Sequence, residues 1–89
     1  MIMKIAVWDT YVKRQNGLRM HFDILVSEET LDENQIYGYG KQYIDSKPFK
    51  TEAFDSKRCN FCHIENATFE IETAIRDKGF YILEMENCT

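Results

Sequence analysis

Residues 4–26 read KIAVWDTYVKRQNGLRMHFDILV, and this stretch decides the fold. Residues 4–12 and 18–26 are rich in β-branched and aromatic residues, which favour strands. Between them stands Asn16-Gly17, a dipeptide that is typical of β-hairpin turns. The sequence therefore predicts an N-terminal hairpin, whose second strand places Leu18, Met20, Phe22, Ile24 and Val26 on one apolar face.

The register of this hairpin follows from the length of its loop. We expect a three-residue loop with Gly17 in the left-handed conformation, which pairs apolar positions of the two strands. This interpretation sets Trp8, Thr10 and Val12 opposite Val26, Ile24 and Phe22. A two-residue Asn-Gly turn would instead place Asp9 opposite Ile24 on the apolar face. In the preferred register, His21 and Asp23 lie together on the other face of their strand.

A helix is predicted next, beginning near Ser27 or Thr30 and ending before Pro48. Thr30 and Glu33 have the spacing of a capping box, and proline disfavours helical angles in the residue that precedes it. The residues expected to face inward are Ile36, Tyr39, Gly40, Tyr43 and Ile44. A glycine at an inward position indicates a close approach between helix and sheet.

The second half of the chain predicts an extended segment, a helix and a last strand. Residues 49–54 fit either a short edge strand or an extended connection. A helix follows with Asn66 as its N-cap and Gly79 as its C-terminal stop. Residues 80–85 then form a strand inside the sheet. We expect an α+β fold, with a small, mostly antiparallel sheet, the N-terminal hairpin, and two helices packed on one face.

Composition excludes several classes of function. The 89 residues, 44% of them hydrophobic, fit a single domain over residues 1–89. The net charge of −4 disfavours a phosphate-binding surface, so we expect no nucleic-acid partner. No apolar run approaches the roughly 20 residues that span a bilayer, and we expect no membrane role. The apolar start ends at Asp9, too early for a signal peptide, which predicts a cytoplasmic protein with reduced thiols.

Chemistry concentrates in Arg58-Cys59-Asn60-Phe61-Cys62-His63, which holds two of the three cysteines and one of the two histidines. A Cys-x-x-Cys-His run serves covalent haem attachment, zinc binding or dithiol chemistry. Haem attachment needs an exported protein and a haem-sized apolar crevice, and neither is expected of this chain. The sequence therefore leaves zinc binding and dithiol chemistry as the possible functions of this run.

Zinc binding would use the thiolates of Cys59 and Cys62, whose two-residue spacing is that of a standard half-site. Tetrahedral coordination needs two more ligands, and the available side chains are His63, His21 and Cys88. Cys62 and His63 are adjacent, so they can bind the same ion only where the chain bends sharply. Cys88 can take part only if the last strand ends beside the cysteine loop.

Two alternatives to zinc stay open. Dithiol chemistry is favoured by Lys57, Arg58 and His63, whose positive charges would lower thiol pKa values, and by a helix that begins near Asn66. In thioredoxin-like proteins, however, the helix begins directly at the cysteines. The other alternative is structural, because cysteine is among the most buried residue types. His21 and Asp23 fit either an acid–base pair or a solvated strand face.

Five short stretches also carry a resemblance: residues 8–12 (WDTYV), 20–23 (MHFD), 61–63 (FCH), 79–82 (GFYI) and 85–88 (MENC). Together they resemble the domain of unknown function 2024 family, over nearly the whole length of the chain. The resemblance implies a bacterial protein with an α+β fold. It implies no particular activity, substrate or cofactor.

Two hypotheses about function follow. The first is a small metal-binding (zinc) or thiol-bearing module built on Cys59, Cys62 and His63, with His21 and Cys88 as further ligands. The second is a non-catalytic interaction or scaffold protein that forms a homodimer, in which the cysteines are structural. The sequence leaves open whether the protein is an enzyme.

Overall fold

The computed structural model describes residues 3–54 and 58–89. Its elements alternate between strands and helices after an initial hairpin. In chain order they are β1 (Lys4–Lys13), β2 (Arg19–Ser27), α1 (Glu33–Asp45), β3 (Cys59–Asn66), α2 (Phe69–Lys78) and β4 (Tyr81–Glu86).

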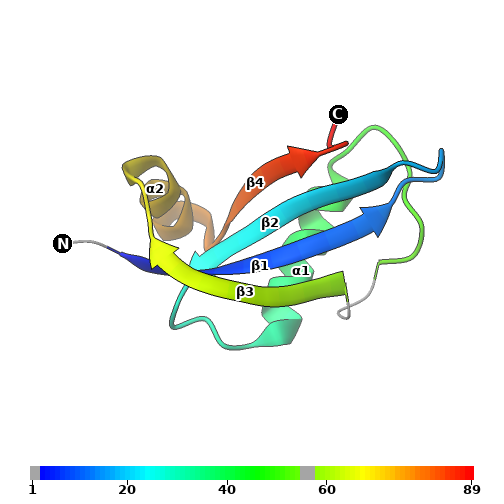
Figure 1. The fold of residues 1–89 in the computed structure, drawn as a ribbon. Coiled ribbons are helices and arrows are strands. Elements are labelled where there is room, and N and C mark those ends of the chain that lie inside the picture. Colours follow the sequence, from blue (N-terminus) through cyan, green and yellow to red (C-terminus); the bar gives the residue numbers. More distant parts are fainter. Residues whose placement is uncertain (1–2, 55–57) are drawn as a thin grey trace.

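The four strands form one sheet in the order β3-β1-β2-β4, and all neighbouring pairs are antiparallel. Figure 1 shows the hairpin at the centre of the sheet, with β3 and β4 at the two edges and α1 behind the central pair. The predicted α+β fold is confirmed. The last strand, however, lies at an edge and not inside the sheet, because only β2 pairs with it.

The hairpin has a three-residue loop with Gly17 in the left-handed conformation, as predicted, but the loop lies one residue earlier and the register of the strands differs. Arg14 donates its backbone N–H to Leu18 around a three-residue loop, and Gly17 has a φ of 93°. This closing pair sets Trp8 opposite Ile24, two residues away from the predicted partner, Val26. The predicted pairing was wrong because it placed the loop too late in the chain. Since side chains alternate with a period of two, the offset leaves each residue on its expected face.

The two helices pack on opposite faces of the sheet, so the expectation that they share one face was wrong. Ile36 and Ile44 of α1 join the even-numbered apolar residues of the hairpin, which include Ala6, Val12, Met20, Phe22, Ile24 and Val26. Ile75 of α2 packs instead with Ile5, Val7 and Leu25. Because these odd-numbered hairpin residues are apolar as well, the second face of the sheet also has to be buried, and α2 buries it.

Each helix begins at a capping residue two positions beyond the one predicted. Asp32, and not Thr30, is the N-cap of α1 and accepts a hydrogen bond from the Asn34 N–H. Thr68, and not Asn66, caps α2. Gly79 ends α2 at a φ of 95°, as predicted. Both N-caps are side-chain oxygens that satisfy free N–H groups of the first helical turn.

The cysteine segment is the largest departure from the predicted structure. Residues 59–66 form the edge strand β3, whereas the sequence predicted a loop here. Residues 49–54 form no strand of their own, and only an isolated bridge joins Thr51 to Arg14. Within the described residues, no helix is long and apolar enough to cross a membrane.

Candidate functional site

The α2 side of the sheet is apolar at one end and polar at the other. Beyond the apolar residues beneath α2, Asp9 of β1 lies directly opposite Asp23 of β2. In the next row, Tyr11 lies opposite His21, and their rings stack at a centroid distance of 4.2 Å. The alternation of each strand thus places two carboxylates and an imidazole on one face.

Asp9, His21 and Asp23 form a compact cluster. Their potential ligand atoms all lie within 4.8 Å of one another. His21 Nε2 is 3.6 Å from Asp9 Oδ1 and 3.6 Å from Asp23 Oδ1. Among the described residues this is the one group of three or more histidine, cysteine or acidic side chains with metal-site spacing.

The cluster is partly withdrawn from solvent. The side chains of Asp23 and His21 are 11% and 17% exposed, whereas that of Asp9 is 36% exposed. Asp23 is the most buried of the three and lies between Asp9 of β1 and Leu83 of β4. His21 Nε2 and Asp23 Oδ1 are buried atoms with no hydrogen-bond partner among the described residues. Such atoms carry a desolvation cost that needs an explanation.

The two carboxyl groups are electrostatically coupled. Burial, followed by the hydrogen bond with Asp9 and the charge of the Asp9 carboxylate, raises the pKa of Asp23 to about 6. Hydrogen bonding with Asp23 in turn lowers the pKa of Asp9 below its ordinary value. In the metal-free protein, a proton on Asp23 therefore relieves the repulsion between two carboxylates that face each other.

A β-bulge brings Cys62 and His63 to the same face as this cluster. Trp8 pairs with Phe61 and Val7 pairs with His63, so Cys62 is the extra residue in β3. The bulge lets two adjacent side chains share one face. His63 Nδ1 lies 3.2 Å from Cys62 Sγ, and the Cys62 thiol hydrogen-bonds Asp9. The sharp bend that the sequence required for joint use of Cys62 and His63 is this bulge.

The electrostatics of Cys62 oppose thiolate formation in the metal-free protein. Desolvation, followed by the charge of Asp9 and its hydrogen bond, raises the pKa of the Cys62 thiol. The sequence predicted the reverse effect from nearby cations and a helix terminus. Lys57 lies outside the described residues, and α2 begins at Phe69, too far along the chain to act on Cys62 as predicted.

Cys59 and Cys88 lie away from the cluster. Cys59 pairs with Thr10 and packs against the core on the α1 side, so the sheet separates it from Cys62. Cys88 is buried in that same core, and its thiol donates to the backbone oxygen of His21. It follows β4, which is at the opposite edge of the sheet from β3. The predicted zinc half-site of Cys59 and Cys62 is therefore not formed, and no disulfide joins these three cysteines.

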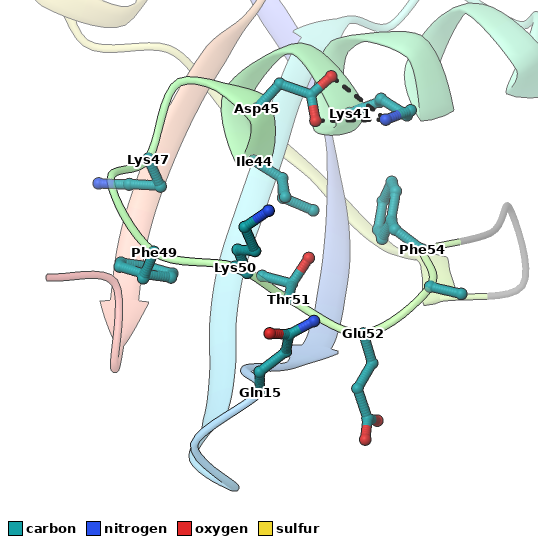
Figure 2. Close-up of a pocket in the computed structure, with 11 residues that line it drawn as sticks. Gln15, Lys41, Ile44, Asp45, Lys47, Phe49, Lys50, Thr51, Glu52 and Phe54 are labelled. Carbon is teal, nitrogen blue, oxygen red and sulfur yellow. Dashed lines mark hydrogen bonds and ion pairs between the residues drawn. The ribbon is translucent and has the colours of Figure 1, made fainter.

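A cavity of about 430 Å³ lies elsewhere, between the end of α1 and residues 47–54 (Figure 2). It is lined by Ile44, Phe49 and Phe54 together with several polar side chains, none of them histidine or cysteine. Lys41 pairs with Asp45 at its rim, and Lys47 pairs with Glu84. Two of its three lysines are thus already paired with carboxylates.

The sequence prediction included His21 in the site but neither of the two carboxylates as metal-binding residues. Asp23 was expected to form an acid–base pair with His21 or to lie on a solvated strand face, and the predicted register did not bring Asp9 opposite Asp23. The correct hairpin register would have predicted this pair of carboxylates, because a loop closed by Arg14 and Leu18 brings Asp9 opposite Asp23.

Comparison with known proteins agrees with this fold. The structure of protein NE1680 from Nitrosomonas europaea, determined by NMR, is similar with a TM-score of 0.83 and 37% sequence identity. The match covers 98% of this chain and 100% of that one. No curated protein matches the chain. A family model described as domain of unknown function (DUF2024) matches residues 3–85, and the chain therefore belongs to that family.

Proposed function

We propose that the protein binds a divalent metal ion at Asp9, His21 and Asp23, and that zinc is the ion the donors favour. One observation carries the proposal: His21 Nε2 and Asp23 Oδ1 are buried without a hydrogen-bond partner among the described residues, and both face the Asp9 carboxylate. A cation at this point would satisfy both atoms and neutralise two adjacent carboxylates.

The spacing of the donors supports a shared ion. Zinc binds imidazole nitrogen and carboxylate oxygen at about 2.0–2.2 Å, so two ligands of a tetrahedral site are about 3.4 Å apart. The two distances of 3.6 Å from His21 Nε2 are close to this value and longer than a hydrogen bond. Small side-chain movements would therefore complete the coordination.

Cys62 and His63, which are exposed, lie outside this group of three and would supply further ligands if they move toward the ion. The Cys62 thiol already contacts Asp9, and a bound cation would favour its thiolate form. His63 Nε2 lies 2.9 Å from Glu65 Oε2, which can orient the ring in the way that carboxylates orient metal-binding histidines. The proposed centre thus keeps Cys62, His63 and His21 from the sequence prediction and leaves out Cys59 and Cys88.

A zinc titration against a competing chromophoric chelator tests the proposal. We expect one equivalent of zinc to bind, and Asp23→Asn to weaken it at least tenfold, since even outer-shell partners of metal ligands change affinity by about 10–100-fold. Asp77→Asn is the matched control, because Asp77 is an exposed residue of α2 without an ion pair among the described residues. Equal zinc affinity in both variants would contradict the proposal.

A second candidate function is self-association through β3. This edge strand exposes seven of its eight residues, and two of them, Phe61 and Ile64, are apolar and 53% and 45% exposed. Exposed apolar edge strands pair readily with strands of other chains. Light scattering at several concentrations should then show a homodimer that Ile64→Lys converts to a monomer. A wild-type monomer at high concentration would exclude this function.

A further inference from the structure

A second cavity, of about 270 Å³, has Tyr11 in its wall, and the ring of Tyr11 stacks on that of His21. It is lined by Tyr11, Val12, Lys13, Arg19, Glu52 and Arg58. Glu52 is held at the rim by its backbone N–H, which donates to the Lys13 carbonyl. Three of the six lining side chains are cationic and one is acidic, although the chain as a whole has a net charge of −4.

The cations of this cavity are placed together by the sheet. Lys13 and Arg19 lie directly opposite each other in the hairpin, and like charges in such positions destabilise a sheet. Arg58 directly precedes β3, whose first residue pairs with Thr10 of β1. Within the part of the chain that the structure describes, none of the three forms an ion pair. Among the described residues, Glu52 is the one acidic side chain that lines the cavity beside these three cations.

Arg19 is held in a defined orientation. Its guanidinium carbon lies 4.8 Å from the centre of the Tyr11 ring, a cation–π contact. The same ring also stacks with that of His21, and the two rings are nearly parallel. A planar guanidinium fixed in this way suits the two oxygens of a phosphate or a carboxylate.

The rows of the hairpin give the distance between this cavity and the metal site. Lys13 and Arg19 form the row next to Tyr11 and His21. Residues two apart on a strand are about 7 Å apart, so the cations lie roughly one row from the metal ligand His21. A small molecule can reach both places at once.

We propose that the cavity holds an oxyanion, a phosphate or a carboxylate group, at one end of a small molecule whose other end binds the metal. The part of this inference that concerns the metal rests on the proposed function. Lys13, Arg19 and Arg58 supply the positive charge, and Tyr11 forms the wall between the oxyanion and His21. The ligand class is thus a small anion that also carries a metal-binding group.

The oxyanion site is tested in metal-free protein, so that zinc has no part in the result. Inorganic phosphate is titrated at low ionic strength and followed by amide chemical shifts in two-dimensional NMR. We expect saturable shifts around Lys13, Arg19 and Arg58, and a dissociation constant at least tenfold weaker in Arg19→Gln and in Arg58→Gln. Lys4→Gln is the control, because it removes the same charge from the same sheet without touching the cavity.

The outcomes separate the two proposals. If Lys4→Gln weakens phosphate binding as much as the cavity variants do, or if wild type shows no saturable shifts, the oxyanion site is wrong even where zinc binds. If phosphate binds but zinc does not, the oxyanion site stands and the metal proposal falls. Malonate in place of phosphate identifies the favoured group, since tighter phosphate binding indicates a phosphoryl ligand and tighter malonate binding a carboxylate.

The link between the two sites has its own test. Phosphonoacetate carries an oxyanion and a metal-binding carboxylate in one small molecule. Zinc-loaded wild type should bind it at least tenfold more tightly than the metal-free protein, and Arg19→Gln should remove most of that gain. Equal affinity with and without zinc would overturn the claim that one ligand spans both sites.

Discussion

Asp9 and Asp23 face each other directly across the two central strands, with the His21 ring nitrogen 3.6 Å from an oxygen of each. Two carboxylates in this position repel each other unless a proton or a cation lies between them. Burial and the facing Asp9 carboxylate raise the pKa of Asp23 to about 6, which favours a proton on this carboxyl group, and we propose that a metal ion replaces that proton. This relationship connects the hairpin register to the chemistry of the molecule.

The pH dependence of stability follows from Asp23. Its pKa is raised from 3.8 to about 6 by folding, so its contribution to stability is full below about pH 4 and is lost as the pH rises through 6. In metal-free protein, the free energy of unfolding of wild type should therefore fall between pH 4 and 7 relative to that of Asp23→Asn. Urea unfolding at several pH values measures this difference. Parallel curves for the two proteins would show that Asp23 does not titrate as described.

Zinc should reverse this trend. The metal competes with the proton on Asp23, so zinc affinity should rise as the pH increases from 5 to 7. A zinc-loaded sample should accordingly gain thermal stability over the range in which the metal-free protein loses it. Thermal unfolding with and without one equivalent of zinc measures the effect. A shift in melting temperature that is the same at pH 5 and pH 7 would contradict it.

The two cysteines of the Cys-x-x-Cys run should behave differently on substitution. Cys59→Ser places a hydroxyl against the apolar core on the α1 side, which should lower stability and leave zinc affinity unchanged. Cys62→Ser removes an exposed thiol beside Asp9, which should weaken zinc binding and leave stability nearly unchanged. Chemical denaturation and zinc titration of both variants provide the comparison. If both lose zinc equally, the sheet does not separate their roles.

The two glycines of α1 give a matched pair for the helix–sheet contact. A Cβ on Gly40 would lie 2.9 Å from Ile24 Cδ1, whereas a Cβ on Gly38 would meet nothing within 4 Å. Gly38→Ala should therefore stabilise the protein by about 1 kcal/mol through helix propensity. Gly40→Ala should lose this gain to overpacking, which costs about 1–3 kcal/mol. Equal free energies of unfolding for the two variants would show that α1 does not approach the sheet closely at Gly40.

The hairpin and the helices were readable from the sequence because their signals are local. Alternating residues in 20–26, the Asn16-Gly17 turn and the Gly79 stop each depend on neighbours in the chain, and the structure agrees with each of them. Leu18 is the exception, because it precedes β2 and is 46% exposed. The inward positions Ile36, Gly40 and Ile44 of α1 follow from helical spacing in the same way. The face on which each helix packs depends on contacts far apart in sequence, and that prediction failed.

β3 was not predicted because a β-bulge interrupts the alternation of its side chains. Its residues on the α1 side are Cys59, Phe61 and Ile64, which are not spaced by two throughout, because the bulge adds Cys62. A search for strict alternation therefore finds no strand in this segment. Strand alternation places Cys59 and Cys62 on opposite faces of the sheet, and the bulge moves His63 to the face of Cys62. The Cys-x-x-Cys-His run is therefore misleading, because its two cysteines do not share a face.

The most direct test of the central claim is the nitrogen NMR spectrum of the two histidine rings during addition of one equivalent of zinc. A metal bound at the proposed centre should shift His21 Nε2 strongly, in slow exchange, and Asp23→Asn should remove that shift. A zinc-dependent shift of His63 in the absence of any change at His21 would contradict the account and return the metal to the cysteine run.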